Sequence, residues 1–144
     1  MAMFLNSALA TWTTTQALSH KRGIHRMQMN ALLRNAYQNE LEAARVAWTR
    51  KALHESFAHL ERALILGQRY FLPHMQVHLY MLRIGWARRD GKEVLGQITR
   101  LLLTPLGHLA GRLPLGNTGG ANVSAFQPMP IAPELDALLK QDEQ

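Results

Sequence analysis

The chain of 144 residues contains no cysteine. This absence excludes disulfide scaffolds, zinc sites built from thiolates, iron–sulfur clusters and cysteine nucleophiles. The chain also lacks a long apolar run. A membrane-spanning helix needs roughly 18 apolar residues, whereas the best stretch, residues 98–115, is interrupted by Thr, Arg, Gly, His and Pro. The sequence therefore predicts no transmembrane segment.

Acidic residues are missing from the first 39 positions, because all ten lie at or after Glu40. The formal net charge is +6, so an anionic surface or a nucleic acid is one alternative for the partner. That alternative depends on charge alone. No block of five or more like charges is present, and such a block is typical of a nucleic-acid-binding arm. We therefore do not expect a nucleic-acid partner.

Residues 1–27 differ from the rest of the chain and are interpreted as an N-terminal extension. Their apolar residues include Phe4, Leu9 and Trp12, whose spacing suits a short amphipathic helix. Positive charge follows this stretch, at residues 20–26, whereas a secretory signal carries its positive charge first. Peripheral membrane contact through residues 1–26 is the less favoured alternative to a plain extension. The remainder, residues 28–144, is expected to form a single domain.

Apolar residues recur at steps of three and four in four consecutive segments, and no alternating strand pattern is present. Asn30 suits an N-cap of the first segment. Asp90 and Gly91 suit a turn before the fourth, and Pro105 should kink or end that fourth helix. The predicted fold is all-α, a compact four-helix bundle. Its helices are expected at residues 30–50, 53–68, 73–88 and 92–103. The apolar residues assigned to the last of them are Val94, Leu95, Ile98, Leu101 and Leu102.

A Gly/Pro-rich tail, residues 111–133, follows the fourth helix and holds four of the six prolines. Apolar residues punctuate it, so we expect it to pack irregularly across the bundle, with Phe126 buried, before a short final helix at 134–140. Within the tail, residues 116–120 read Gly-Asn-Thr-Gly-Gly. Such a sequence suits either an anion-binding nest of backbone N–H groups or a structural turn. The structural turn is favoured, because no strand precedes the motif and no Lys-Ser/Thr ending follows it.

Two resemblances extend this interpretation. Residues 44–48 and 56–63 resemble one helical hairpin of a tetratricopeptide-type repeat, although no second copy follows at the 34-residue period. More widely, residues 29–139 resemble the bacterial domain of unknown function DUF3703. The motifs that carry this resemblance are Phe57-Ala-His-Leu-Glu-Arg-Ala63, Pro73-His-Met-Gln-Val-His78 and Pro114-Leu-Gly-Asn-Thr-Gly-Gly-Ala-Asn-Val-Ser-Ala-Phe-Gln-Pro-Met-Pro130. The resemblance implies a small bacterial protein, cytoplasmic in location, with a weak association to heavy-metal resistance.

One group of side chains could bind a metal ion. His74 and His78 stand four apart in the third predicted helix and so lie on one face. Glu55 and His59 have the same spacing in the second helix, which should run antiparallel to the third. If the two pairs face each other, they form a His/His/His/Glu site for Zn(II), Ni(II) or Cu(II). The alternative is that these histidines are partly buried, hydrogen-bonded structural groups, or simply exposed.

No arrangement of nucleophile, base and orienting group is evident, so no catalytic residue is predicted. The leading functional hypothesis is a non-enzymatic accessory or protein-interaction domain linked to heavy-metal homeostasis, with a protein partner or a homo-oligomer. The alternative is a metal-binding protein or metal-dependent enzyme that uses the histidine cluster.

Overall fold

The computed structural model describes residues 28–144. The predicted N-terminal amphipathic helix lies outside these residues. Five helices are described: α2 (Ala31–Thr49), α3 (Leu53–Gly67), α4 (Phe71–Ala87), α5 (Gly91–Ala110) and α6 (Pro133–Asp142). The described part of the chain contains no strand, so the all-α prediction is confirmed. Within it, no helix is both long and apolar enough to cross a membrane.

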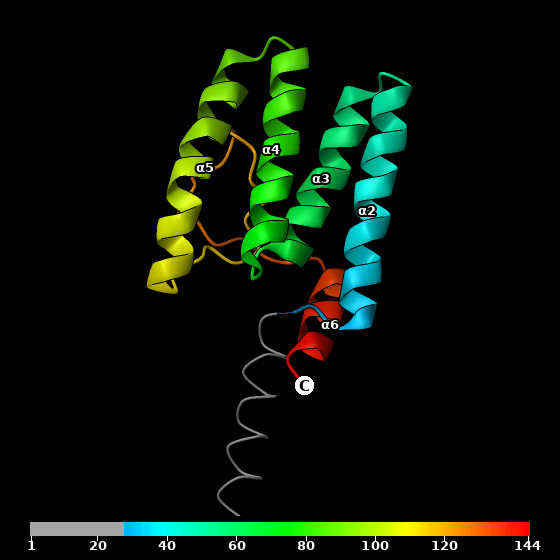
Figure 1. The fold of residues 1–144 in the computed structure, drawn as a ribbon, viewed down its shortest axis with the longest axis vertical. Coiled ribbons are helices and arrows are strands. Elements are labelled where there is room, and N and C mark those ends of the chain that lie inside the picture. Colours follow the sequence, from blue (N-terminus) through cyan, green and yellow to red (C-terminus); the bar gives the residue numbers. More distant parts are fainter. Residues whose placement is uncertain (1–27) are drawn as a thin grey trace, which may run out of the picture.

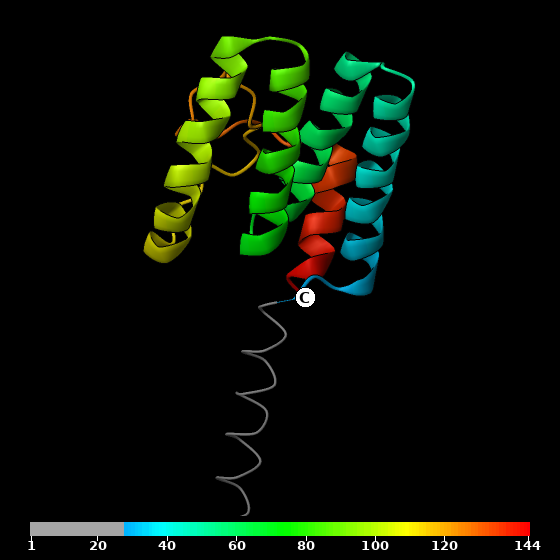
Figure 2. The same cartoon turned by 45° about the horizontal axis from the view of Figure 1, so that its top comes forward.

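The first four helices form two hairpins that lie side by side (Figure 1). Helices α2 and α3 form one hairpin, α4 and α5 form the other, and α3 packs on α4 between them. The short α6 lies against the ends of α2 and α3, as the tilted view also shows (Figure 2). Each of the first four helices thus packs mainly on its neighbours in the sequence, as short connections favour, whereas α6 returns to α2 and α3.

Two of the predicted helix starts are confirmed by their caps. The side chain of Asn30 accepts a hydrogen bond from the N–H of Leu33 at 2.8 Å, and Asp90 accepts one from the N–H of Glu93 at 3.0 Å. Each cap satisfies a backbone donor that the first turn of a helix leaves without a partner.

The predicted end of the fourth helix is wrong. Pro105 lies inside α5, which continues to Ala110 and ends at Gly111 in the left-handed conformation, with φ of 63°. Proline removes one helical N–H and leaves a carbonyl one turn earlier without its donor. Pro105 is exposed, so water can reach that carbonyl. Gly111 adopts the left-handed conformation at little steric cost and ends the helix.

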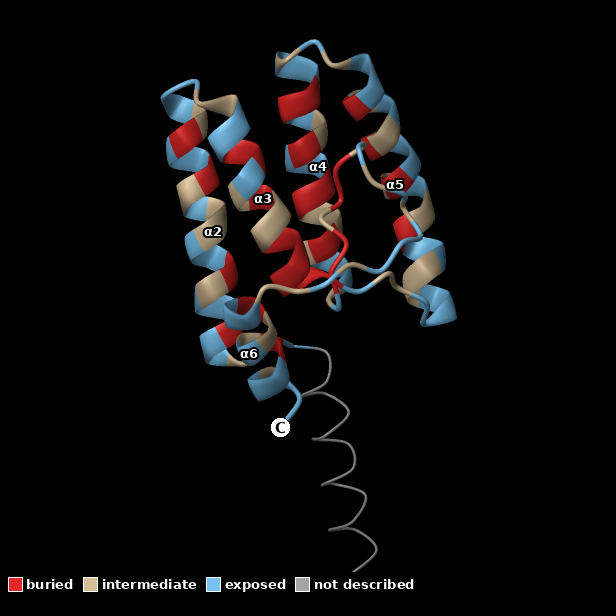
Figure 3. Ribbon diagram, turned by 180° about the vertical axis from the view of Figure 1, so that it is seen from behind, coloured by how far each residue is buried: buried red, intermediate tan, exposed pale blue. Residues whose placement is uncertain are grey.

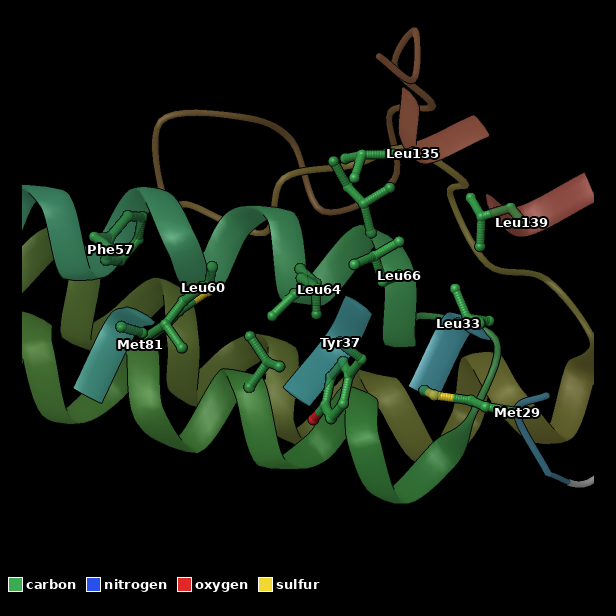
Figure 4. Close-up of a cluster of buried hydrophobic side chains, with 14 of the residues drawn as sticks. Met29, Leu33, Tyr37, Phe57, Leu60, Leu64, Leu66, Met81, Leu135 and Leu139 are labelled. Atoms are coloured by element: carbon green, nitrogen blue, oxygen red, sulfur yellow. The ribbon is translucent and has the colours of Figure 1, made fainter. Parts of the chain in front are cut away.

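An apolar core joins α2, α3 and α4, with α6 covering one end (Figure 4). The predicted apolar residues of the second and third helices are largely buried there, among them Leu60 and Met81. Leu135 and Leu139 of α6 complete the core beside α2 and α3. The largest fully buried side chains include Tyr37, Leu33, Leu60, Leu64, Leu66, Met81 and Ile84.

Helix α5 does not contribute its predicted apolar residues to this core. Leu95 is 67% exposed and Leu102 is 71% exposed. The buried side chains of α5 are instead polar: Glu93, Gln97, Arg100 and Thr104. Periodicity indicated an amphipathic helix correctly, but the more polar face of α5 is the one that packs inside. The reason lies in the tail, whose backbone needs hydrogen-bond partners.

The tail, residues 111–132, runs across α3, α4 and α5 on the face seen from behind (Figure 3). Its buried residues are Gly116, Asn117, Gly119 and Gly120. The prediction that Phe126 is buried is wrong, because this side chain is 74% exposed. The tail packs through its backbone and through Asn117, so its apolar residues are not the main anchors.

Candidate functional site

Helices α4 and α5 bring three histidines together. His74 and His78 lie one turn apart on α4, as the spacing predicted, and both are buried. Their Nε2 atoms are 3.1 Å apart. His108, near the end of α5, places its Nε2 atom 3.0 Å from Nδ1 of His74. The three rings therefore form a continuous chain of nitrogen contacts.

The contact between His78 and Gln97 determines which ring nitrogen of each histidine carries the proton. Nδ1 of His78 is 2.8 Å from Oε1 of Gln97, and an amide oxygen can only accept, so His78 donates from Nδ1. Neutral His78 then accepts at Nε2 from the Nε2–H of His74. His74 in turn accepts at Nδ1 from the Nε2–H of His108. All three hydrogen bonds point toward Gln97, and only Nδ1 of His108 is left without a contact in the chain.

All three histidines are held in the neutral state. Burial, together with the neighbouring His78 and His108, lowers the pKa of His74 to about 3, and a hydrogen bond with the backbone of Gln68 works against this shift. Burial also lowers the pKa of His78 to about 4. The bond from His78 to Gln97 works against this shift, and the positive charge of Arg100 adds to it. Burial also lowers the pKa of His108.

Gln97 connects the histidines to the tail. It is fully buried, and its amide nitrogen donates to the carbonyl of Gly119 at 2.7 Å and to Glu93 at 2.6 Å. The other carboxylate oxygen of Glu93 accepts from the N–H of Ala121 at 3.0 Å. The inner face of α5 thus supplies partners for tail backbone that would otherwise be buried without them.

Two further side chains fix the tail: Arg100 from α5, and Asn117 from within the tail itself. Arg100 is only 7% exposed, and its Nη2 atom donates to the carbonyls of Gly120 and Val123 at 2.9 and 2.8 Å. The side chain of Asn117 accepts from the N–H of Gly119 at 2.9 Å. This is the Asx-type closure expected of a structural turn.

The glycines of the motif confirm that turn. Gly116 and Gly119 have φ of 77° and 81°, backbone angles that residues with a Cβ rarely adopt. A Cβ on Gly119 would lie 2.2 Å from Cδ2 of Leu64 and 3.2 Å from Cε1 of His78. The tail backbone therefore approaches the helices closely only because position 119 is glycine.

A cavity of about 350 Å³ lies beside the histidines, between α4, α5 and the tail. Its polar lining comes from His74, His78, Gln68, Arg100, Thr104, Arg112 and Asn117. Its apolar lining includes Leu64, Leu103, Leu106, Leu113 and Phe126. No acidic side chain lines it.

The structure separates the predicted four-residue metal site. His74 and His78 lie together, but Nδ1 of His59 contacts Oε2 of Glu40 at 2.7 Å. Glu55 pairs with Arg50 at the exposed start of α3. Over residues 28–144, no group of three or more His, Asp or Glu side chains is placed to hold a metal ion. The second pair lies elsewhere because its face of α3 meets α2 and not α4.

His108 and Gln97 were not predicted as site residues from the sequence, and Arg100 was expected only as one of several surface cations. The polar face of α5 offered a signal, since Glu93, Gln97, Arg100 and Thr104 recur at steps of three and four. This face looked like the solvent side of the helix. Only the placement of the tail shows that it is buried.

The family model described as "Protein of unknown function (DUF3703)" matches residues 31–139. The chain belongs to the DUF3703 family. Searches of the curated proteins and of the solved structures found no match. The family description of this DUF3703 chain assigns no activity, so its chemistry has to be inferred from its own geometry.

Proposed function

We propose that this chain is a non-enzymatic interaction domain whose working unit is a pair of copies joined through α5. The observation that carries the proposal is the reversed polarity of this helix. Its inner face is polar, and its outer face is an apolar stripe of Leu95, Ile98, Leu102, Leu106 and Leu109. Exposed fractions along the stripe range from 43% to 87%. A contiguous apolar surface of this kind is typical of a protein interface.

The spacing of the stripe is symmetric and favours a second copy as the partner. Counting outward from Leu102, apolar residues occur four and seven positions away in both directions. A two-fold axis through Leu102 would place Leu95 against Leu109 of the other copy. Two-fold dimers are the commonest oligomers, and their interfaces are self-complementary in this way.

The charges around the stripe also suit self-association. Between Lys92 and Arg112 the only residues charged at neutral pH are Glu93 and Arg100, which are both buried and face the tail. Two antiparallel α5 helices would therefore meet along the stripe without opposing like charges, and the same register brings Lys92 near Arg112 of the other copy only beyond its ends. The steps of three and four residues suit packing of side chains between neighbouring helices.

The absence of cysteine allows a direct test. In Leu102→Cys the only cysteine lies on the expected axis, so oxidation should join two copies covalently. Leu95→Cys alone should not cross-link, whereas a mixture of Leu95→Cys and Leu109→Cys should. Cross-linking of Leu95→Cys with itself would contradict the antiparallel arrangement.

Light scattering supplies the second readout. We expect a dimer for the wild type and a monomer for Leu102→Glu, because a charge would be buried at the centre of the interface. Leu32→Glu is the matched control, since Leu32 is 51% exposed on α2 and outside the stripe. A monomeric wild type, or a Leu102→Glu variant that stays dimeric, would overturn the proposal.

A second candidate function is the binding of a transition-metal ion by His74 and His78. The favourable observation is the 3.1 Å separation of their Nε2 atoms. Two nitrogens on one tetrahedral zinc ion, each about 2.0–2.1 Å away, lie about 3.3 Å apart. The pair supplies only two ligands, and the neighbouring charge of Arg100 opposes a cation.

Calorimetric titration with Zn(II), Ni(II) and Cu(II) tests this candidate. Binding that disappears in His74→Ala/His78→Ala and persists in His54→Ala would support it. Because His54 is exposed on α3, its replacement controls for nonspecific histidine binding. No heat with any of the three ions would remove it.

A further inference from the structure

We propose that the cavity between α4, α5 and the tail binds a small carboxylate with an apolar body. Its volume of about 350 Å³ falls within the range of small-molecule sites, roughly 300–1,000 Å³. Its lining combines a cationic part with a larger apolar part. This composition suits a ligand that has one anionic end and one hydrocarbon or aromatic end.

Arg100 is the group that would bind the anionic end of the ligand. A buried guanidinium needs acceptors for its five N–H groups and a compensating negative charge. Nη2 donates to two tail carbonyls, and no other hydrogen bond of this side chain is formed within residues 28–144. Those same residues contain no fully buried side-chain nitrogen that lacks a partner. The remaining guanidinium N–H groups must therefore be accessible, and Arg100 lines the cavity.

Glu93 carries a compensating negative charge, but this charge does not face the cavity. The carboxylate of Glu93 faces Gln97 and the N–H of Ala121, and it does not line the cavity wall. Arg112, which is exposed, adds a second positive charge to the lining. A carboxylate beside Arg100 would accept charge-assisted hydrogen bonds, which are stronger than neutral ones, and the charge of Arg112 would favour it further.

The apolar part of the cavity lining would contact the apolar end of the ligand. Leu64, Leu103, Leu106 and Leu113 line the cavity together with Phe126. Phe126 is otherwise 74% exposed, so a ligand against it would cover part of an aromatic ring that the fold leaves open. Inorganic phosphate could use the arginines but would gain nothing from this wall.

The same arrangement makes an anion a better ligand than a metal ion. Arg100 lines the same cavity as His74 and His78, and after burial its charge contributes to the lowered pKa of His78. That charge would oppose a cation at His74 and His78, whereas it would attract an anion. Thr104 and Asn117 add neutral polar groups to the lining.

Calorimetric titration tests the proposal on the wild-type chain. Octanoate and benzoate are the probes, and octanamide is the neutral match for octanoate. Inorganic phosphate supplies charge without an apolar body, and zinc chloride supplies a cation. We expect at least one of the two carboxylates to bind with a dissociation constant below about 1 mM, and the other three compounds to bind at least tenfold more weakly.

Three variants locate the site. Arg112→Gln should weaken the carboxylate at least tenfold without altering the fold, because Arg112 makes no ion pair within the described residues. Arg100→Lys should also weaken it while keeping the charge that the tail needs. Lys92→Gln is the control, since this exposed cation lies at the opposite end of α5. In ¹H–¹⁵N spectra the amides of Gly107 and Gly119 should shift on binding.

Several outcomes would overturn the proposal. Equal binding of octanamide would mean that the cavity recognises only apolar surface. Equal binding of phosphate would mean that it recognises only charge. Binding of zinc without either carboxylate, no binding of either carboxylate at millimolar concentration, or an unchanged affinity in Arg112→Gln would each reject it. These results test the cavity and not the α5 stripe, with which the lining shares only Leu106.

Discussion

The α2–α3 hairpin and the α4–α5 hairpin consist of helices of similar length, yet they bury different side chains. The first places Leu33, Leu60 and Leu64 inside and keeps its ion pairs, such as Arg45–Glu42, at the surface. The second buries six polar residues, and its leucines lie outside; the six are His74, His78, Glu93, Gln97, Arg100 and Thr104. The difference follows from what each hairpin covers.

The α2–α3 hairpin covers other helices, whose backbones satisfy their own hydrogen bonds, so only apolar surface has to be matched. The α4–α5 hairpin covers an irregular tail, whose N–H and C=O groups need partners from side chains. Polar burial in this half is therefore a requirement of the tail. It leaves the outer face of α5 free to carry apolar residues.

Acid should selectively destabilise the polar half of the fold, which consists of the α4–α5 hairpin and the tail. This is the largest effect that we expect. His74 and His78 have folded pKa values of about 3 and 4, below the unfolded value of about 6.5. As pH falls below 6.5, the unfolded chain takes up protons that the folded chain excludes. Stability should therefore be complete above pH 6.5 and decline by about 1.4 kcal/mol per pH unit for each histidine down to about pH 4.

Urea unfolding at pH 7, 6 and 5 measures this slope. The variant His78→Asn should lose about half of it, while His54→Gln, at an exposed position, should retain it. A free energy of unfolding that stays constant from pH 7 to pH 5 would mean that the histidines are solvated.

Truncation in the apolar half should have the next largest effect. Leu60 is 2% exposed in the core, and Leu60→Ala should lower the free energy of unfolding by about 2–5 kcal/mol. This loss should not depend on pH. Leu72→Ala, at a position 75% exposed on α4, should change stability by less than about 0.5 kcal/mol. Similar losses for the two variants would contradict the assignment of the core.

The polar half should be sensitive to a substitution that makes it more apolar. Gln97→Leu leaves the Nδ1–H of His78 and the carbonyl of Gly119 without partners, and each buried unsatisfied group costs about 1–3 kcal/mol. We expect a loss of at least about 2 kcal/mol in chemical denaturation. Gln38→Leu, at an exposed position on α2, is the control. If Gln97→Leu is neutral or stabilising, the tail does not depend on this network.

Phe126→Ala should have the smallest effect, although the sequence alone suggested a large one. With 74% of the residue exposed, its removal should change the thermal melting temperature by no more than a few degrees. A drop of ten degrees or more would show that the ring packs on the helices. The same variant should weaken carboxylate binding if the cavity has the proposed ligand.

Periodicity was enough to predict the apolar half and not enough for the polar half. In α2 and α3 the apolar face and the buried face largely coincide, as Tyr37 and Leu60 show, each only 2% exposed. In α5 they are opposite, because burial there is set by a tail more than ten residues distant in sequence. His74 and His78 could be paired from their spacing, but His108 enters through tertiary packing, which no local pattern encodes.

The contact between the two ends of the described fold bears on how the domain assembles during synthesis. The N–H of Asn30 donates to Asp142 at 2.7 Å, across a sequence separation of 112 residues. At 5–20 residues per second, the ribosome needs roughly 5 to 20 s to make the chain between them. During that interval Leu33 and Leu66 have no cover from Leu135 and Leu139. The nascent α2–α3 hairpin therefore leaves part of its apolar surface open to solvent until α6 has emerged.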